Sequence, residues 1–360
     1  MKHHALALAV LAALFPTAPA QAQGSAQGSA QFYGLLDVGV EYLDHAAGGG
    51  SGVRVISGGK NTSRWGVRGS EDLGGGLKAV YNLEGGVLLD TGAADGALFK
   101  RQAYVGLDGS LGRLVIGRSF TTTYDLVIKF DPMGFAPNYS WATGGSASGP
   151  SKYGMTTSFD NLVKYTGRSG AFTYGASIGL GEQAGDAAAG RKLAVGGSWS
   201  ADGLAFMAAW EQVNGSTLAA TGMGDSKRDR TRALHLAADY RSGAWRTTFG
   251  MRAYRMRPGQ PAAAEVRGDT FWGGVSHVDG RVTLTAAIYH VNTRELPAGR
   301  DADPSLLVAR AMLALSKRTD LYLSLAHARA DAGQPVSLSR DEAGDADTQS
   351  GLTAGIQHRF

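Results

Sequence analysis

The chain lacks cysteine among its 360 residues, so no disulfide framework and no CxxC metal or redox motif is possible. It also lacks the HExxH, P-loop and strand-to-helix GxGxxG patterns of metal and nucleotide sites. Several histidines lie singly, with no nucleophile motif near them, at His235, His277, His290 and His327. We therefore predict no catalytic residues, no metal site and no cofactor.

Long apolar runs and basic clusters are missing too. After residue 22, no apolar run approaches the roughly 18 residues that a helical membrane span needs. The formal charge is only +4, and Lys and Arg are spread singly without a basic cluster among aromatics, so we do not expect nucleic-acid binding. The mean hydropathy of −0.13 is that of a soluble protein, but a β-barrel gives the same average because half of each strand is polar.

The N-terminus has the three parts of a secretory signal peptide. Met1–His4 is a short basic region, Ala5–Phe15 is an apolar stretch too short to span a bilayer, and an A-x-A cleavage motif ends at Ala22. We predict a signal peptide at 1–22, with cleavage after Ala20 as the alternative. The mature chain is then exported, and it is periplasmic, secreted or an outer-membrane barrel.

The rest of the chain, 23–360, alternates apolar and polar residues in segments of about 9–11 residues, which is typical of strands in a transmembrane barrel. Sixteen such segments occur, at 31–43, 62–70, 77–87, 98–108, 113–119, 161–167, 171–180, 191–200, 203–213, 231–240, 244–255, 269–278, 281–291, 305–316, 321–330 and 349–360. Tight Gly, Asp and Ser turns alternate with long connections, near 44–61, 88–97, 120–160, 181–190, 214–230, 256–268, 292–304 and 331–348. We predict an all-β fold, a 16-stranded antiparallel transmembrane β-barrel with a wet lumen.

A soluble β-sandwich is the alternative fold, because it also alternates hydrophobic and polar residues. Two features oppose it. The asymmetry between short turns and long loops persists along the whole chain, and the chain ends in an alternating segment whose last residue is the aromatic Phe360.

One connection stands out, at 120–160. It is rich in Gly, Ser, Thr and Pro, with a short helical turn predicted near Tyr124–Lys129. A structureless segment of about forty residues inside a compact domain is usually a functional loop. We predict that it folds into the barrel and narrows the lumen.

Several motifs resemble the general porins of Gram-negative bacteria, in particular the beta-proteobacterial branch. They are SRWGVRGSEDLGGGLKAVYNLEGG (Ser63–Gly86), LFKRQAYVGLDGSLGRLVIGR (Leu98–Arg118), YDLVIKFDP (Tyr124–Pro132) and the two ends of the mature chain. The resemblance covers essentially the whole mature chain. It implies a homotrimer in outer-membrane lipid and lipopolysaccharide that lets small hydrophilic solutes diffuse passively. It also implies an inward-folded third loop and recognition of Phe360 by the outer-membrane assembly machinery.

In this family, wall arginines face loop carboxylates across the constriction. By position Arg64 and Arg101 match the wall cluster, and both face the lumen if Trp65, Val67 and Tyr104 face outward. A third family arginine is replaced by Ser158, and Met133 stands where a loop carboxylate is usual, which leaves Asp125 and Asp131 as the loop's acids.

Each of these four constriction residues also has a structural alternative. Arg64 and Arg101 would simply pair with Glu84 and hold strand register. Asp125 would cap the loop helix, and Asp131 would form a turn before Pro132.

The alternation assigns further side chains to the pore lining, namely Asp37, Arg68, Lys78, Glu84 and Lys164. The inward charges are mainly basic, and rings of basic residues favour anions, so we predict a weak to moderate anion preference. The alternative function is a substrate-specific channel for small anionic or sugar-like solutes, with an aromatic slide on the loop at Phe130, Phe135, Tyr139 and Trp141. We favour the other reading of these aromatics, in which they pack the loop against the wall.

Overall fold

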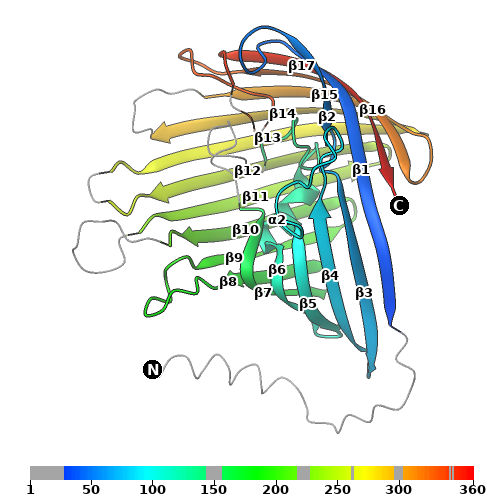
Figure 1. The fold of residues 1–360 in the computed structure, drawn as a ribbon, viewed down its shortest axis with the longest axis vertical. Helices are drawn as coiled ribbons and strands as arrows, with labels where there is room; N and C mark the ends of the chain where they lie inside the picture. The colour runs from blue at the N-terminus through cyan, green and yellow to red at the C-terminus, as the bar shows by residue number, and fades with distance from the viewer. Residues whose placement is uncertain are drawn as a thin grey trace.

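A computed structural model describes residues 28–142, 156–216, 228–260, 263–295, 303–339, 342 and 344–360. The predicted signal peptide and the middle of the predicted loop 120–160 lie outside these residues. Within the described ranges the chain is almost entirely β-strand, in one antiparallel sheet (Figure 1). The strands are β1 (Ser29–Leu43), β2 (Gly52–Ser57), β3 (Arg64–Gly74), β4 (Leu77–Gly86), β5 (Gln102–Gly109), β6 (Gly112–Phe120), β7 (Ser158–Ser169), β8 (Phe172–Gly179), β9 (Lys192–Ala201), β10 (Leu204–Asn214), β11 (Arg230–Ser242), β12 (Trp245–Arg257), β13 (Val266–Asp279), β14 (Val282–Glu295), β15 (Ser305–Ala314), β16 (Thr319–Arg329) and β17 (Thr348–Arg359).

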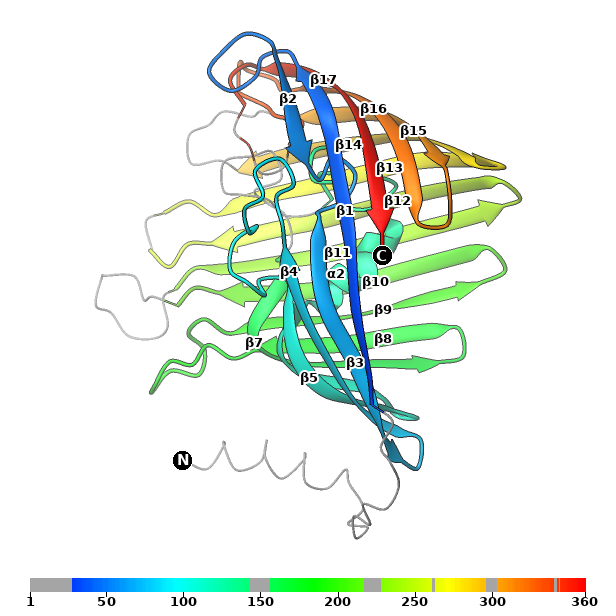
Figure 2. The same ribbon diagram turned by 45° about the vertical axis from the view of Figure 1, so that its right-hand side comes forward.

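The sheet closes on itself, because the first strand pairs with the last. In β1, Leu35 to Leu43 lie opposite Arg359 to Gly351 of β17, and Figure 2 shows the two strands side by side. The other edge of β1 pairs with β3 along Ser29–Leu35 and with β2 along Val38–Leu43. These two segments therefore share one wall position, and the described strands form a closed 16-stranded antiparallel barrel, as the alternation predicts.

Strand β2 corrects one detail of the sequence analysis. The segment 44–61 is not a continuous loop, because Gly52–Ser57 pairs with β1. Its outward residues Val53 and Val55 alternate with polar neighbours, but the run is shorter than the segments that the sequence analysis counted. Between β2 and β3 the chain leaves the wall at Gly58–Ser63, and the backbone amides of Lys60 and Asn61 bond the carboxylate of Asp37.

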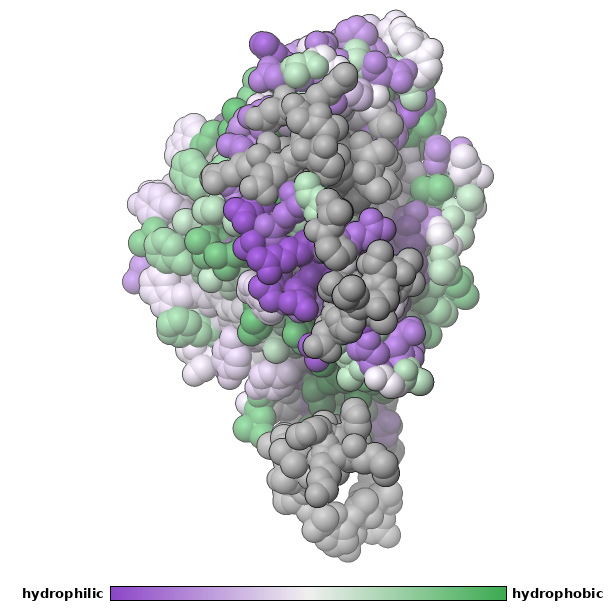
Figure 3. Space-filling model, turned by 90° about the vertical axis from the view of Figure 1, so that its left-hand side faces the viewer, coloured by the Kyte–Doolittle hydropathy of each residue, from purple (hydrophilic) through white to green (hydrophobic). Residues whose placement is uncertain are grey.

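The two faces of the sheet have opposite character. Large apolar side chains are exposed on the outer face of almost every strand, for example Phe32, Val105, Phe249, Leu284 and Leu325. The alternate residues point inward, where carboxylates, arginines and hydroxyls are common. Figure 3 views the end with the long connections and shows hydrophilic residues at the centre with hydrophobic residues on the flanks. The barrel is therefore apolar outside and polar within.

The β6–β7 connection, residues 121–157, is here called the inner loop. It begins with α2 (Thr122–Val127) and the 3-10 turn η1 (Ile128–Phe130), which confirms the predicted helical turn. Thr121 caps α2 by accepting a bond from the Tyr124 amide. Figures 1 and 2 both show α2 inside the barrel. Neither of the short helical segments described here has the length or the apolar content of a membrane-spanning helix.

Candidate channel constriction

One side of the inner loop packs against the inner wall formed by β9–β16. Leu126 and Val127 of α2 join a buried cluster with Met207 and Ala209 of β10. Further along the loop, Phe130, Met133, Phe135, Tyr139 and Trp141 are buried in the same cluster, which includes wall residues from β13 to β16. Burial of these apolar side chains fixes the loop in position.

Two wall glycines allow the loop to come close. A Cβ at Gly274 would lie 2.5 Å from Cβ of Pro132, and a Cβ at Gly196 would lie 2.8 Å from Cδ1 of Leu126. Both distances are shorter than a normal contact, so the loop requires a bare backbone at these positions.

Wall side chains also bond the loop backbone. The Trp272 indole donates to the Phe130 carbonyl at 2.8 Å, and Arg252 Nη1 donates to the Ala142 carbonyl at 2.7 Å. Arg246 Nη2 donates to the Lys129 carbonyl. These donors satisfy carbonyls that an irregular segment leaves without partners.

Asp131 lies inside the loop and not on the lumen surface where the family pattern placed it. Its carboxylate is 2% exposed and accepts four hydrogen bonds, from the amides of Met133 and Phe135 at 3.2 and 2.6 Å, and from the hydroxyls of Ser140 and Tyr289 at 2.6 and 2.5 Å. The turn alternative therefore describes this geometry better, and Asp131 connects the loop to β14.

The side of the lumen opposite the buried loop face is formed by β3–β6 and by β1 near Tyr33, where Arg64 and Arg101 meet Glu84. Arg101 Nε donates to Glu84 at 2.7 Å, and Arg64 Nε lies 4.0 Å from the same carboxylate. The Tyr33 hydroxyl also donates to Glu84 at 2.7 Å. The structure thus brings the two predicted arginines together around one carboxylate.

Asp125 lies on the side of α2 that faces away from the buried cluster, here called the free side of the loop. Its side chain is 42% exposed and forms an ion pair with Lys164 of β7, which also donates to the Phe120 carbonyl at 2.9 Å. Because Thr121 is the helix cap, Asp125 is not needed for that role and faces the lumen.

The predicted orientation of Tyr104 is wrong. Gln102, Tyr104 and Asp108 line a cavity inside the barrel, whereas Val105 is exposed on the outside. Arg101 nevertheless reaches the lumen, because it precedes the first residue of β5 and the alternation of the strand does not constrain it.

The remaining predicted pore-lining residues lie on the inner face in different settings. Asp37 is fully buried beneath the Gly58–Ser63 segment and also accepts a bond from the Tyr322 hydroxyl at 2.7 Å. Arg68 lies over the Tyr33 ring at 4.5 Å, near the short-turn end. Lys78 is exposed on the same face of β4 as Glu84.

The four aromatic residues proposed for a solute slide are all buried. Phe130, Phe135, Tyr139 and Trp141 are each 5% exposed or less, and they pack the loop on the wall. Aromatics do reach the lumen nearby, since Phe120 stacks on Tyr124 with ring centroids 4.3 Å apart and Arg101 lies 5.2 Å from the Phe120 centroid. No pattern in the sequence marks Phe120 or Tyr124 as lumen aromatics.

The sequence gives no sign that Lys60 reaches the lumen, because its segment, 44–61, has the composition of a loop outside the wall. Its amine lies 3.0 Å from Asp320, on the opposite side of the β1–β17 seam.

Among the described residues, no group of His, Asp and Glu could hold a metal ion.

A closed barrel with an apolar outer face, a charged lumen and a loop fixed across it defines an outer-membrane channel. The sequence pattern of the family described as Gram-negative porin matches residues 7–333. The chain belongs to this family and is an outer-membrane porin, a water-filled channel for passive passage of small hydrophilic solutes.

One relative and two solved structures are similar to this chain over nearly its whole length. Outer membrane porin protein 32 of Delftia acidovorans is 29% identical over 100% of both chains. The structure titled "Anion-selective porin from Comamonas acidovorans" superposes with a TM-score of 0.79 at 24% identity, over 93% of this chain and 100% of that one. The trimer form of the outer membrane protein OmpT of Vibrio cholerae gives a TM-score of 0.68 at 18% identity, over 92% of this chain and 99% of that one.

Proposed function

We propose that this porin passes anions in preference to cations. The observation that carries the proposal is the sharing of Glu84 by Arg64 and Arg101, which leaves one positive charge in excess at the free side of the lumen. A wet constriction with excess positive charge attracts anions and repels cations.

The inner loop supports the same preference. Asp131 is buried, Met133 stands where the family often has a carboxylate, and Asp125 is offset by Lys164. The loop therefore offers little negative charge to a permeating ion. The solved relative whose title calls it anion-selective has the same fold, and this likeness agrees with the proposal.

The zero-current potential tests the proposal. Purified, folded protein is inserted in a planar bilayer under a potassium chloride gradient. We expect stepwise conductance with a potential that favours chloride. A potential that favours potassium would reject the anion preference while leaving the channel itself intact.

The proposed assembly is a homotrimer, as the trimer form of the Vibrio cholerae relative suggests. Aromatics on the outer face of β1 and β3 supply a candidate contact, since the exposed Phe32 and the half-buried Trp65 have ring centroids 6.2 Å apart and Trp65 contacts Phe99. Detergent-solubilised protein should run as a trimer before heating and as a monomer after it. We propose no enzymatic activity for this channel.

Phe360 is the proposed signal for the assembly machinery. Its ring packs on Phe32 with centroids 5.6 Å apart, and its backbone bonds Gly34 of β1 in both directions. This seam forms only when the barrel closes, so recognition would precede closure. Outer-membrane lipid and lipopolysaccharide are the proposed neighbours of the apolar outer face, and small hydrophilic solutes are the proposed occupants of the lumen.

A further inference from the structure

A second cavity, of about 600 Å³, opens on the lumen at the short-turn end, beneath the inner loop. Its wall comes from β11–β15, its roof from the loop, and Lys60 and Asn61 reach it from the segment between β2 and β3. Five of its lining residues are basic and one is acidic. They are Lys60, Lys129, Arg241, Arg246, Arg310 and Asp131.

The positive charges of this cavity are only partly compensated in the described part of the chain. Arg241 and Arg246 share Asp239, at 3.0 and 2.5 Å. Lys60 shares Asp320 with Arg359. Asp131 adds little, because its carboxylate is buried and occupied by four donors.

Arg310 is the least satisfied of these cations. Its side chain is more than nine-tenths buried, its Nε donates to the Ser324 hydroxyl at 3.1 Å, and no ion pair to it occurs among the described residues. Its Nη2 is also buried, and it has no hydrogen-bond partner among the described residues. Asp37 attracts Arg310 only from beyond ion-pair distance, and its carboxylate is bonded by the Lys60 and Asn61 amides and the Tyr322 hydroxyl. A buried guanidinium that no carboxylate contacts directly is unfavourable, and a bound anion would relieve this cost.

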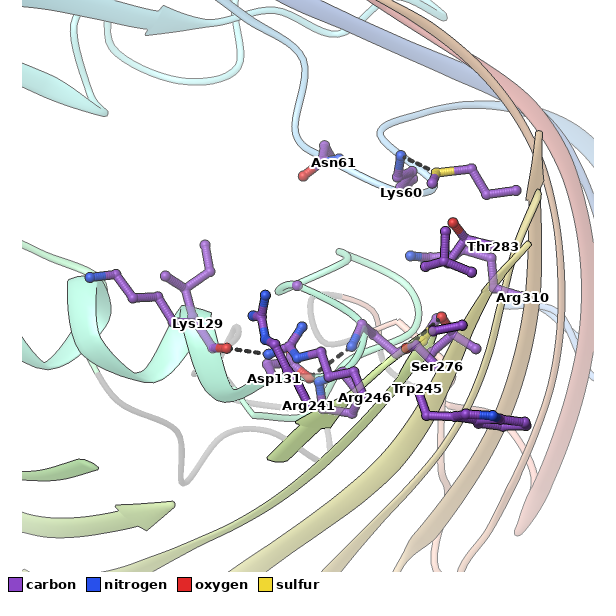
Figure 4. Close-up of a pocket in the computed structure, with 18 of the residues that line it drawn as sticks. Lys60, Asn61, Lys129, Asp131, Arg241, Trp245, Arg246, Ser276, Thr283 and Arg310 are labelled. Carbon is purple, nitrogen blue, oxygen red and sulfur yellow. Dashed lines mark hydrogen bonds between the residues drawn. The ribbon is translucent and has the colours of Figure 1, made fainter. Parts of the chain in front are cut away.

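Hydroxyl groups lie beside the cations on the same wall. Ser276 and Thr285 are 3.0 Å apart, and Thr283 lines the cavity with them. Figure 4 shows Lys60 and Arg246 on opposite sides of the space, Arg310 on the wall between them, and the amine of Lys129 directed away.

We propose that this cavity is a saturable binding site for a compact multivalent oxyanion, of the charge and size of inorganic phosphate. Lys60, Arg246 and Arg310 supply the charge, and the hydroxyls of Thr283 and Thr285 supply further donors. Guanidinium groups bond oxyanions through paired N–H donors, and several donors from different directions suit an ion with several oxygens better than chloride. The inference deepens the proposed anion preference and rests on it.

Block of chloride current by inorganic phosphate tests the site. Single channels of the full mature protein are recorded in potassium chloride near neutral pH while phosphate is added. We expect the chloride conductance to fall and to saturate with phosphate. Arg310→Gln should weaken the apparent affinity by about tenfold, the effect of losing one charge-assisted bond.

Two further variants are measured. Lys60→Gln should also weaken the block by phosphate. Because Lys60 lies outside the β-strands, this variant still tests the site if Arg310→Gln does not fold. Arg329→Gln removes a positive charge from a side chain that is 71% exposed on the outer face, and it should leave the block unchanged.

Absence of saturable block in the parent, or equal block in the parent and both cavity variants, overturns the site. The zero-current potential is measured on the same channels, so a failure of the anion preference itself would be seen separately.

Discussion

The two sides of the inner loop differ in kind. The side against β9–β16 is dry, and it buries Phe130, Tyr139 and Trp141 together with the fully bonded carboxylate of Asp131. The side toward β3–β7 is wet, and it presents Asp125 to Lys164 and Tyr124 to the lumen. One short segment thus has an anchored side, which packs against β9–β16, and a free side, which faces the solutes in the lumen.

The difference shows how an irregular loop can stand inside a water-filled barrel. Apolar burial and bonds to buried polar groups hold the anchored side, so the free side needs no internal packing of its own. Charged residues on the free side can then act on the ion selectivity of the pore without holding the loop in place. Substitutions on the anchored side should therefore change the shape of the pore, and substitutions on the free side should change only its preference.

The largest effect is expected from Asp131→Ala on the anchored side. The change leaves the Tyr289 hydroxyl, the Ser140 hydroxyl and two amides without their acceptor, and each such buried donor costs about 1–3 kcal/mol. The loop should detach from the wall while the barrel strands stay paired. Single-channel conductance should become larger and noisier.

Asp131→Asn is the matched control, because it keeps the volume and part of the acceptor capacity. It should give an intermediate conductance. A conductance equal to that of the parent in Asp131→Ala, with the barrel folded, would show that the anchored side does not set the pore.

A smaller effect is expected on the free side, where Arg64→Gln with Arg101→Gln should reduce the anion preference. A unit charge at 4 Å is worth about 1 kcal/mol in water, so the chloride-to-potassium permeability ratio should fall by about two- to fivefold. The reversed change, Glu84→Gln, should raise the ratio by a similar factor. Zero-current potentials of the three proteins measure both.

The pair of variants has an internal check. If Glu84 only holds the arginines in register, then Glu84→Gln would disorder them and lower the anion preference together with the arginine variants. Opposite shifts support a charge mechanism, and parallel shifts reject it.

The barrel was predictable from sequence because a strand in a barrel wall has a simple period of two. That period placed Asp37, Glu84 and Lys164 on the inner face, where they lie. It gave the wrong face for Tyr104, because the expected strand began at Leu98 and β5 begins at Gln102.

The anchored side of the loop was less accessible to sequence reasoning. Asp131 and Tyr289 are 158 residues apart, and no local pattern connects them. A fixed loop must bury apolar surface, so the sequence favours burial of the loop aromatics, but it does not identify their partners in β13–β16. The basic cavity was hidden for the same reason, since Lys60, Arg246 and Arg310 meet only when the barrel closes.

The smallest expected effect belongs to a charge cluster away from both sides of the loop. At the rim with the long connections, the carboxylate of Glu265 accepts bonds from Arg255, Arg257 and Arg267. These bonds, chiefly the one from Arg255, lower the pKa of Glu265 from 4.5 to about 2. A carboxylate with a depressed pKa stabilises the fold above its unfolded pKa, and it loses that contribution as the pH falls toward the folded value.

We therefore expect Glu265→Gln to lower the thermal unfolding temperature slightly and by a constant amount above pH 4.5, with the gap to the parent closing between pH 4.5 and about 2. The gap is small because the cluster is exposed to solvent. Thermal unfolding of both proteins across this range is the measurement, and a gap that widens on acidification would contradict the assignment. Channel conductance at neutral pH should not change, since Glu265 touches neither the anchored nor the free side of the inner loop. That result would separate charges that support the barrel from charges that act on permeating ions.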